Sequence, residues 1–181
     1  MFLDKAIAVP YGQIGDDEVR WLAEHAEHRQ KLVELGSWTG KSTRALVDNT
    51  PGEVWAVDTW RMKEIHPTLQ TFMKSDDWAF EEFMKNLGDA KNLRVVRQTS
   101  LEAAHSLQSL APFDMVFIDA DHSYEAVKAD ILAWQPLLSS DGLLCGHDYY
   151  PTEPTWCGVG KALEELFPHI NLMSGTSIWW I

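Results

Sequence analysis

Residues 32–43 read LVELGSWTGKST, which we interpret as a buried strand, a glycine turn and the start of a helix. Gly36 and Gly40 can adopt backbone conformations that other residues avoid, and they let a ligand approach the main chain. Ser42 and Thr43 suit the beginning of a helix. A strand, a glycine turn and a helix in this order are typical of a nucleotide-type ligand site.

The spacing of the turn differs from two common phosphate-binding patterns. A dinucleotide fingerprint has G-x-G-x-x-G, and a phosphate loop has G-x-x-x-x-G-K-[ST]. This segment has G-x-x-x-G-K-S, and Glu34 stands at the end of the strand just before the turn. A carboxylate there would repel a pyrophosphate, so the pattern argues against a phosphate group bound at the turn.

A second apolar strand ending in an acid follows about 20 residues downstream, the distance expected for a ribose-binding carboxylate. Residues 54–58 read VWAVD, an apolar run that Asp58 closes. A carboxylate in this place can accept both hydrogen bonds of a ribose diol. We therefore expect Asp58 to bind a ribose.

These segments resemble the class I methyltransferases that use S-adenosylmethionine. Residues 34–40, ELGSWTG, look like the glycine-rich motif of that family, and residues 56–60, AVDTW, look like the acidic end of its second strand. Downstream, IDADHSY at 118–124 and GHDY at 146–149 are similar to a branch of small-molecule methyltransferases. The resemblance spans roughly residues 12–181, and four segments in the right order make it specific.

The resemblance implies S-adenosylmethionine as the cofactor and gives roles to the strand ends. Glu34 and the turn would hold the methionine part, Asp58 the ribose hydroxyls, and Ser100 with Leu101 the adenine edge. A carboxylate-rich pocket suits the positive charge of the sulfonium. The expected cofactor-binding residues are Glu34, Gly36, Ser37, Gly40, Ser42, Asp58, Thr59, Ser100, Leu101 and Asp119.

The candidate catalytic residues are Asp119, His122, His147 and Asp148. An oxygen acceptor must lose its proton, and two devices are available. In one, Asp119 and Asp148, alone or together with His147 or Asp121, bind a magnesium-like ion, which lowers the pKa of an acceptor hydroxyl. In the other, His122 or His147 acts as a general base near neutral pH. Related metal-dependent enzymes carry an acid pair where this chain has His147 and Asp148, so both devices stay open.

The order of the predicted elements indicates an α/β fold. Strands are expected at 31–36, 53–58, 93–97, 113–118 and 142–146, with helices at 16–28, 41–49, near 76–88, 100–109, 123–135 and 160–167, and short strands at 169–173 and 176–180. This alternation implies a mostly parallel sheet with helices on both faces. The resemblance adds a closing antiparallel hairpin, so we expect a Rossmann-like, doubly wound sheet of seven strands.

Length and charge limit the partners. The 181 residues fit one domain, 1–181, and the net charge of −12 disfavours nucleic acid or an anionic membrane as the main partner. Residues 1–10 are too short and too acidic for a secretory signal, and no apolar run approaches a membrane span. We expect a cytoplasmic protein with a small-molecule acceptor, and leave open whether it forms a homo-oligomer.

The acceptor is expected to be a hydroxyl of a sugar, a polyketide-like molecule or a phenol. The long segment 60–78 and residues 149–156 are rich in aromatic side chains, so we expect acceptor recognition there. Two alternatives remain. A NAD-type oxidoreductase would need a different glycine spacing. A non-catalytic, cofactor-binding partner in a biosynthetic assembly would not need carboxylates at both Asp119 and Asp148.

Overall fold

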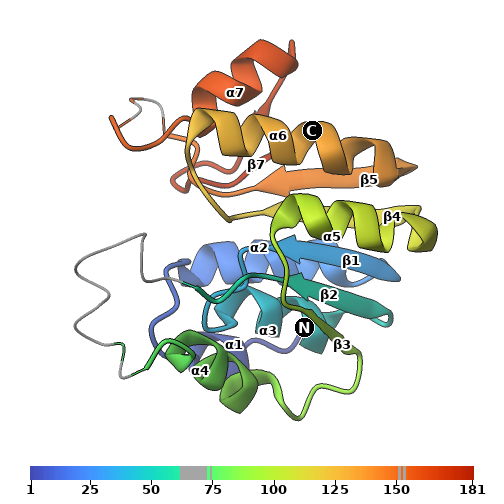
Figure 1. Cartoon of the computed structure of the whole chain (residues 1–181), viewed down its shortest axis with the longest axis vertical. Coiled ribbons are helices and arrows are strands. Elements are labelled where there is room, and N and C mark those ends of the chain that lie inside the picture. The colour runs from blue at the N-terminus through green and yellow to red at the C-terminus, as the bar shows by residue number, and fades with distance from the viewer. Residues whose placement is uncertain (62–72, 74, 151, 153) are drawn as a thin grey trace.

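The computed structural model describes residues 1–61, 73, 75–150, 152 and 154–181, and within them seven strands form one sheet of order β3-β2-β1-β4-β5-β7-β6 (Figure 1). Strands β1 to β5 pair in parallel, whereas β7 runs antiparallel to both β5 and β6. The predicted doubly wound sheet with its closing hairpin is confirmed. The strands are β1 (Lys31–Leu35), β2 (Glu53–Val57), β3 (Leu93–Val96), β4 (Phe113–Ile118), β5 (Leu138–Gly146), β6 (Asn171–Leu172) and β7 (Trp179–Trp180).

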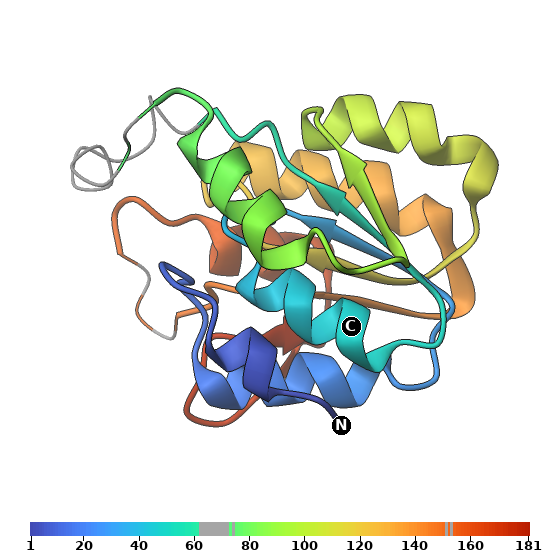
Figure 2. The ribbon, with the colours of Figure 1, turned by 90° about the horizontal axis from the view of Figure 1, so that it is seen from below.

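Helices cover both faces of this sheet (Figure 2). Helices α1 to α4 contribute to one buried apolar cluster, and α5 to α7 contribute to a second cluster across the sheet. The helices are α1 (Asp4–Ile7), α2 (Asp16–Ala26), α3 (Lys41–Asn49), α4 (Trp78–Leu87), α5 (Ser100–Leu107), α6 (Tyr124–Trp134) and α7 (Val159–Leu166).

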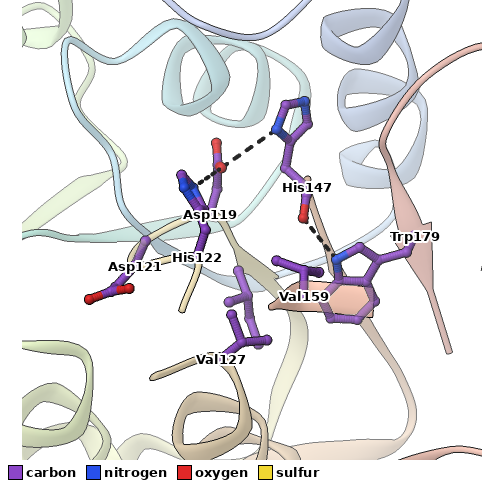
Figure 3. Close-up of a pocket in the computed structure, with 9 residues that line it drawn as sticks. Asp119, Asp121, His122, Val127, His147, Val159 and Trp179 are labelled. Atoms are coloured by element: carbon purple, nitrogen blue, oxygen red, sulfur yellow. Dashed lines mark hydrogen bonds and ion pairs between the residues drawn. The ribbon is translucent and has the colours of Figure 1, made fainter. Parts of the chain in front are cut away.

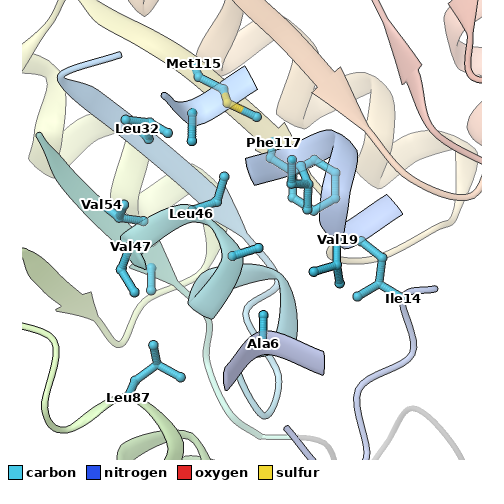
Figure 4. Close-up of a cluster of buried hydrophobic side chains, with 14 of the residues drawn as sticks. Ala6, Ile14, Val19, Leu32, Leu46, Val47, Val54, Leu87, Met115 and Phe117 are labelled. Atoms are coloured by element: carbon cyan, nitrogen blue, oxygen red, sulfur yellow. The ribbon is translucent and has the colours of Figure 1, made fainter. Parts of the chain in front are cut away.

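Alternating side chains along each strand divide the core into these two clusters. Leu32 and Phe117 point to the first cluster, shown in Figure 4, whereas their neighbours Val33 and Val116 point to the second. Successive residues of a strand face opposite sides of a sheet, and both sides here are covered by helices. This explains why the central strands read as continuous apolar runs rather than as alternating ones.

Three details differ from the expected elements. Helix α1 was not anticipated, because a helix of four residues is too short to give a visible apolar period. Strand β5 begins at Leu138 rather than at 142, because residues 139–141 are polar and partly or fully exposed and so gave no apolar strand pattern. The hairpin strands β6 and β7 have only two residues each.

The order of the strands reverses between β1 and β4, whose connections lead to opposite edges of the sheet. In such sheets, ligands bind outside the carboxyl ends of the strands at the point of reversal. The turn after β1 and the acid after β4 both lie there. None of the helices in the described parts of the chain is long and apolar enough to cross a bilayer.

Candidate active site

Glu34 ties the end of β1 to the start of α3. Its side chain is completely buried, and its Oε2 accepts a 2.6 Å hydrogen bond from Ser37 Oγ and another from Thr43 Oγ1. Its Oε1 is buried with no hydrogen-bond partner among the described residues. Burial raises the pKa of Glu34 to about 7, although the hydroxyl donors, which include Ser42, favour the charged form. The turn is thus built around the Glu34 carboxyl group, and the Oε1 atom of this group has no hydrogen bond to the described residues.

The two glycines of the turn are required by its shape. Gly36 has φ +89°, and a Cβ atom there would lie 2.0 Å from the carbonyl oxygen of Asp119. Gly40 has φ +92°, and a Cβ atom there would lie 2.2 Å from Leu87 in α4. Both backbones are in the left-handed region that favours glycine. The turn therefore packs directly against the end of β4.

Asp58 fastens the turn to the end of β2. Its Oδ2 accepts a 2.9 Å hydrogen bond from the backbone N–H of Trp38, and its Oδ1 accepts a 2.7 Å bond from the N–H of Trp60. Burial raises the pKa of Asp58, and backbone donors, including that of Thr59, oppose this shift. Trp60 lies in the apolar core and donates its Nε1–H to the Trp38 carbonyl at 2.8 Å.

Ser100 and Leu101 lie at the first turn of α5, after the end of β3. The Ser100 hydroxyl donates to Asp130 of α6, and its carbonyl accepts a 3.1 Å bond from Trp134 Nε1. Leu101 is 49% exposed, so its side chain is accessible to a ligand. The sequence pattern could not reveal that the Ser100 hydroxyl already has a buried partner.

The four predicted catalytic residues converge at the ends of β4 and β5. His122 Nε2 lies 3.0 Å from Asp148 Oδ2 and 3.6 Å from Asp119 Oδ1. His147 Nδ1 lies 3.2 Å from Asp148 Oδ2 and 3.7 Å from Asp119 Oδ1. In Figure 3 the two imidazole rings lie on either side of the Asp119 carboxylate. Both histidines thus share both acids.

Asp148 and the two histidines stabilise one another's charged forms, whereas burial raises the pKa of Asp119 although both histidines oppose this shift. Burial alone would lower the pKa of each histidine, but Asp119 and Asp148 raise the pKa of His122 to about 10. The same acids, with Glu18, raise the pKa of His147 to about 11. Burial would raise the pKa of Asp148, but the two histidines lower it far below its usual range. In this arrangement both imidazole rings are doubly protonated and positively charged at neutral pH.

The cluster has a donor set that a divalent cation could use. One ligand atom each from Asp119, His122 and Asp148 can be chosen so that all lie within 4.8 Å of one another. Oxygen ligands of divalent cations lie about 2.0 to 2.6 Å from the ion, which spans ligand separations up to about 5 Å. Asp121, although in the same motif, is exposed and accepts a 2.8 Å bond from the N–H of Ser123.

Two further residues complete the cluster: Glu18, which sequence reasoning missed, and Tyr150, which was expected only among the aromatic residues of the acceptor-binding region. Glu18 Oε2 of α2 lies 3.1 Å from His147 Nε2, and the Tyr150 hydroxyl donates to Asp148 Oδ1 at 2.6 Å. In sequence, Glu18 reads as an ordinary acid of the first helical turn after Gly15. No local pattern indicated that it would reach a residue beyond β5.

A small pocket adjoins the cluster, with Val127, Val159 and Trp179 among its apolar lining residues (Figure 3). Trp156 is 59% exposed, and its ring lies edge-on at 5.9 Å from the His122 ring. The expectation of an acceptor-binding region in 60–78 falls largely on 62–72 and 74, outside the described residues. The aromatic side chains of Tyr150 and Trp156 do lie beside the acid–histidine cluster.

Sheet order, glycine turn and strand-end acids together define a Rossmann-like domain of the methyltransferase class. Residues 33–149 match the family model described as "Methyltransferase domain", which is more than half of the chain. The chain therefore belongs to this methyltransferase family, as its resemblance to class I methyltransferases predicted. The NAD-type oxidoreductase alternative is wrong at the level of the family.

Two solved structures share the fold. One is the O-methyltransferase TomG from Streptomyces achromogenes, which is involved in tomaymycin synthesis and was solved in complex with SAM. It is 16% identical to this chain with a TM-score of 0.68, and the match covers 98% of this chain and 86% of TomG. The O-methyltransferase from Bacillus cereus, solved with SAH, is 16% identical with a TM-score of 0.67, and the match covers 97% and 84% of the two chains.

A curated relative is the uncharacterized protein y4gI of Sinorhizobium fredii (strain NBRC 101917 / NGR234), which is 28% identical over 133 residues. The match covers 71% of this chain but only 14% of y4gI. The chain thus spans about a seventh of the length of that relative.

Proposed function

We propose that this protein transfers the methyl group of S-adenosylmethionine to a hydroxyl oxygen of a small molecule. The observation that carries the proposal is the convergence of Asp119, His122, His147 and Asp148 beside the glycine turn in a methyltransferase domain. Methyl transfer is an in-line displacement, so positioning supplies much of the acceleration. A hydroxyl acceptor also needs help with its proton, and charged groups beside the turn suit that task.

The cofactor would lie across the ends of β1, β2 and β4. The close packing of Gly36 on the Asp119 carbonyl brings the turn to the end of β4, and the Oε1 of Glu34, which has no hydrogen-bond partner among the described residues, offers an acceptor for a donor on the methionine part. Asp58 would accept the ribose hydroxyls, with Thr59 next to it. The remaining proposed contacts are Ser37, Gly40, Ser42, Ser100, Leu101 and Asp119.

Magnesium or a similar divalent cation would be held by Asp119 and Asp148, with His122 in reach of both. Such an ion, when bound, lowers the pKa of an acceptor hydroxyl. Asp119 and Asp148 provide the negative charge, and Asp119 and His122 also line the small pocket. A bound cation would also displace the proton from any histidine ligand, since a metal binds the neutral ring.

The direct-base alternative receives less support. With pKa values of about 10 and 11, His122 and His147 hold their protons at neutral pH and cannot accept another. As cations they would stabilise an acceptor oxyanion instead. The paired acids that raise these pKa values therefore favour the metal-assisted route over proton removal by a free imidazole.

The acceptor would be a sugar, a polyketide-like molecule or a phenol. The exposed Trp156 and the nearby Tyr150 offer ring faces beside the cluster, and their ring centroids lie 6.0 Å apart. Aromatic faces stack on phenols and pack against sugar rings. The two neighbours with O-methyltransferase names lend the oxygen acceptor further support. A cytoplasmic location and the single-domain organisation are part of the proposal.

Isothermal titration tests the cofactor first. The purified protein should bind S-adenosylmethionine and S-adenosylhomocysteine at micromolar concentrations and should not bind NAD. A panel of phenols, catechols and sugar nucleotides is then incubated with S-adenosylmethionine and magnesium, and S-adenosylhomocysteine is measured. Turnover that a chelator abolishes would support the metal-assisted route. Cofactor binding without turnover on any acceptor would support the non-catalytic module instead.

A further inference from the structure

We propose that Glu18, which lies outside the matched segment 33–149, is a positioning residue that fixes the His147 ring so that Nδ1 faces the two acids of the site. The inference rests on the proposed function, because it gives the N-terminal helix α2 a part in the same site. It also explains why a charged side chain at the third position of α2 is buried, with 8% of its surface exposed.

Both oxygens of the Glu18 carboxylate are held in place. Oε2 accepts a 2.7 Å hydrogen bond from the N–H of Gly15 and lies 3.1 Å from His147 Nε2, an ion-pair contact in which the buried nitrogen has no hydrogen bond of regular geometry to a described residue. Oε1 accepts a 3.2 Å bond from the N–H of Ser177, whose hydroxyl lies 3.5 Å away. The carboxylate therefore cannot turn away from the imidazole without losing contacts at both ends.

The backbone of His147 is fixed on both sides, so only its ring can move. Its N–H donates to the Ile118 carbonyl at 3.1 Å, and its carbonyl accepts a 3.1 Å bond from Trp179 Nε1. If the ring turned over by half a turn, carbon atoms would replace both nitrogens. The ion pair with Glu18 would then be lost, as would the 3.2 Å contact with Asp148.

The charges around His147 favour the observed orientation. Glu18 faces the ring from α2, Asp119 from the end of β4, and Asp148 from the adjacent position in the chain. The nearby His122 contacts the same two acids, Asp119 and Asp148. The same carboxylate holds the loop before β7 through Ser177. Helix α2, the strand ends and the C-terminal hairpin thus meet at one side chain.

The test replaces Glu18 by glutamine, which keeps the size of the side chain and its acceptor for Ser177 but removes the charge that faces His147. Glu24→Gln, an exposed position on the same helix, is the matched control. Proton–nitrogen spectra of the labelled protein read the two ring nitrogens separately, and His147→Asn assigns the signals. Titration with S-adenosylhomocysteine measures cofactor affinity in parallel.

We expect the parent protein to show a downfield Nε2 proton of His147 that exchanges slowly with water. In Glu18→Gln this signal should move upfield and exchange at least about tenfold faster, because the negative charge that holds the ring and its proton in place is gone. Glu24→Gln should leave it unchanged. The affinity for S-adenosylhomocysteine should change by less than about twofold in both variants, since neither contacts Asp58 or the turn.

An unchanged Nε2 signal in Glu18→Gln, or its absence from the parent protein, would overturn the inference. If Glu18→Gln does not fold, Glu18→Asp keeps the charge but shortens the reach, and it should weaken the same signal. A parent protein that shows the signal but binds no S-adenosylhomocysteine would refute the proposed function and leave the role of Glu18 in orienting the ring intact.

Discussion

Gly36 touches the backbone of Asp119 so closely that a Cβ atom on the glycine would lie 2.0 Å from the Asp119 carbonyl oxygen. The turn proposed to hold the cofactor and the acid proposed to act on the acceptor are therefore in direct contact. The N–H of Gly36 also donates to the Val57 carbonyl at 2.8 Å, just before Asp58. A change at this glycine would disturb all three strand ends together.

Gly36→Ala should destabilise the protein more than Gly175→Ala. Both glycines have positive φ angles, +89° and +79°, but a Cβ atom at Gly175 would meet nothing within 4 Å. Left-handed strain alone costs about 1 to 2 kcal/mol per residue. At Gly36 the clash with backbone adds roughly 1 to 3 kcal/mol, by comparison with overpacked cores. Urea unfolding measures the free energy of unfolding of both variants. Equal losses of stability would show that the turn can shift to accommodate the added Cβ atom.

Asp58→Ala should weaken the binding of S-adenosylhomocysteine by roughly 10- to 100-fold, the loss expected when hydrogen bonds to a charged acceptor are removed. The alanine also frees the N–H groups of Trp38 and Trp60, which loosens the turn. Isothermal titration measures the affinity. Asp141→Ala, at an exposed position of β5, is the control and should bind normally. Unchanged affinity in Asp58→Ala would remove the ribose contact from the proposal.

Most of the sheet could be predicted because its strands are short apolar runs between helical segments. The grouping of Asp119, His122, His147 and Asp148 could also be anticipated, since the carboxyl ends of adjacent parallel strands lie at one edge. Glu18 could not, because its local role at the start of α2 already accounts for an acid there. Long-range contacts of this kind leave no periodicity in a single sequence.

Ser100, the first residue of α5, illustrates the same limit. Its position after β3 was predicted, but its hydroxyl is engaged by Asp130, a buried acid of α6 whose pKa burial raises to about 6. Nothing in the sequence of α6 distinguishes Asp130 from a solvent-exposed acid. A hydrogen bond between side chains of two different helices, such as that between Ser100 and Asp130, can be recognised only in the folded structure.

Asp148→Asn should abolish turnover, with a loss of at least about 100-fold, and should change the affinity for S-adenosylhomocysteine by less than about twofold. Asparagine is preferred to alanine here because Asp148 has φ +64°, a conformation that asparagine tolerates. The amide keeps an acceptor for Tyr150 but removes the charge that both histidines share. Methyl transfer to the acceptor found in the panel is the measurement.

Normal turnover by Asp148→Asn would exclude both the metal and the acid–base proposals at this position. Asp141→Asn serves as the control, because Asp141 lies at an exposed place in β5. If turnover and cofactor affinity fall together in Asp148→Asn, the cluster also supports the cofactor site, and the roles of the two ends of the site are not separable.

Glu34 should make the stability of the cofactor-free protein depend on pH. Its folded pKa is about 7, above its ordinary value of 4.5, so the folded state holds the proton more tightly than the unfolded chain. The contribution of the protonated form is fully present below pH 4.5 and is lost as the pH rises to about 7. At 1.36 kcal/mol per pKa unit, the shift from 4.5 to about 7 corresponds to a loss of roughly 3 kcal/mol.

Glu34→Gln isolates this effect, because the amide oxygen can still accept from Ser37 and Thr43 but does not titrate. The free energy of unfolding of the parent minus that of the variant should fall between pH 4.5 and pH 7 and stay level above it. Urea unfolding at several pH values gives both curves, and Glu24→Gln should run parallel to the parent. Parallel curves for Glu34→Gln would mean that the buried carboxyl keeps its charge without the cofactor.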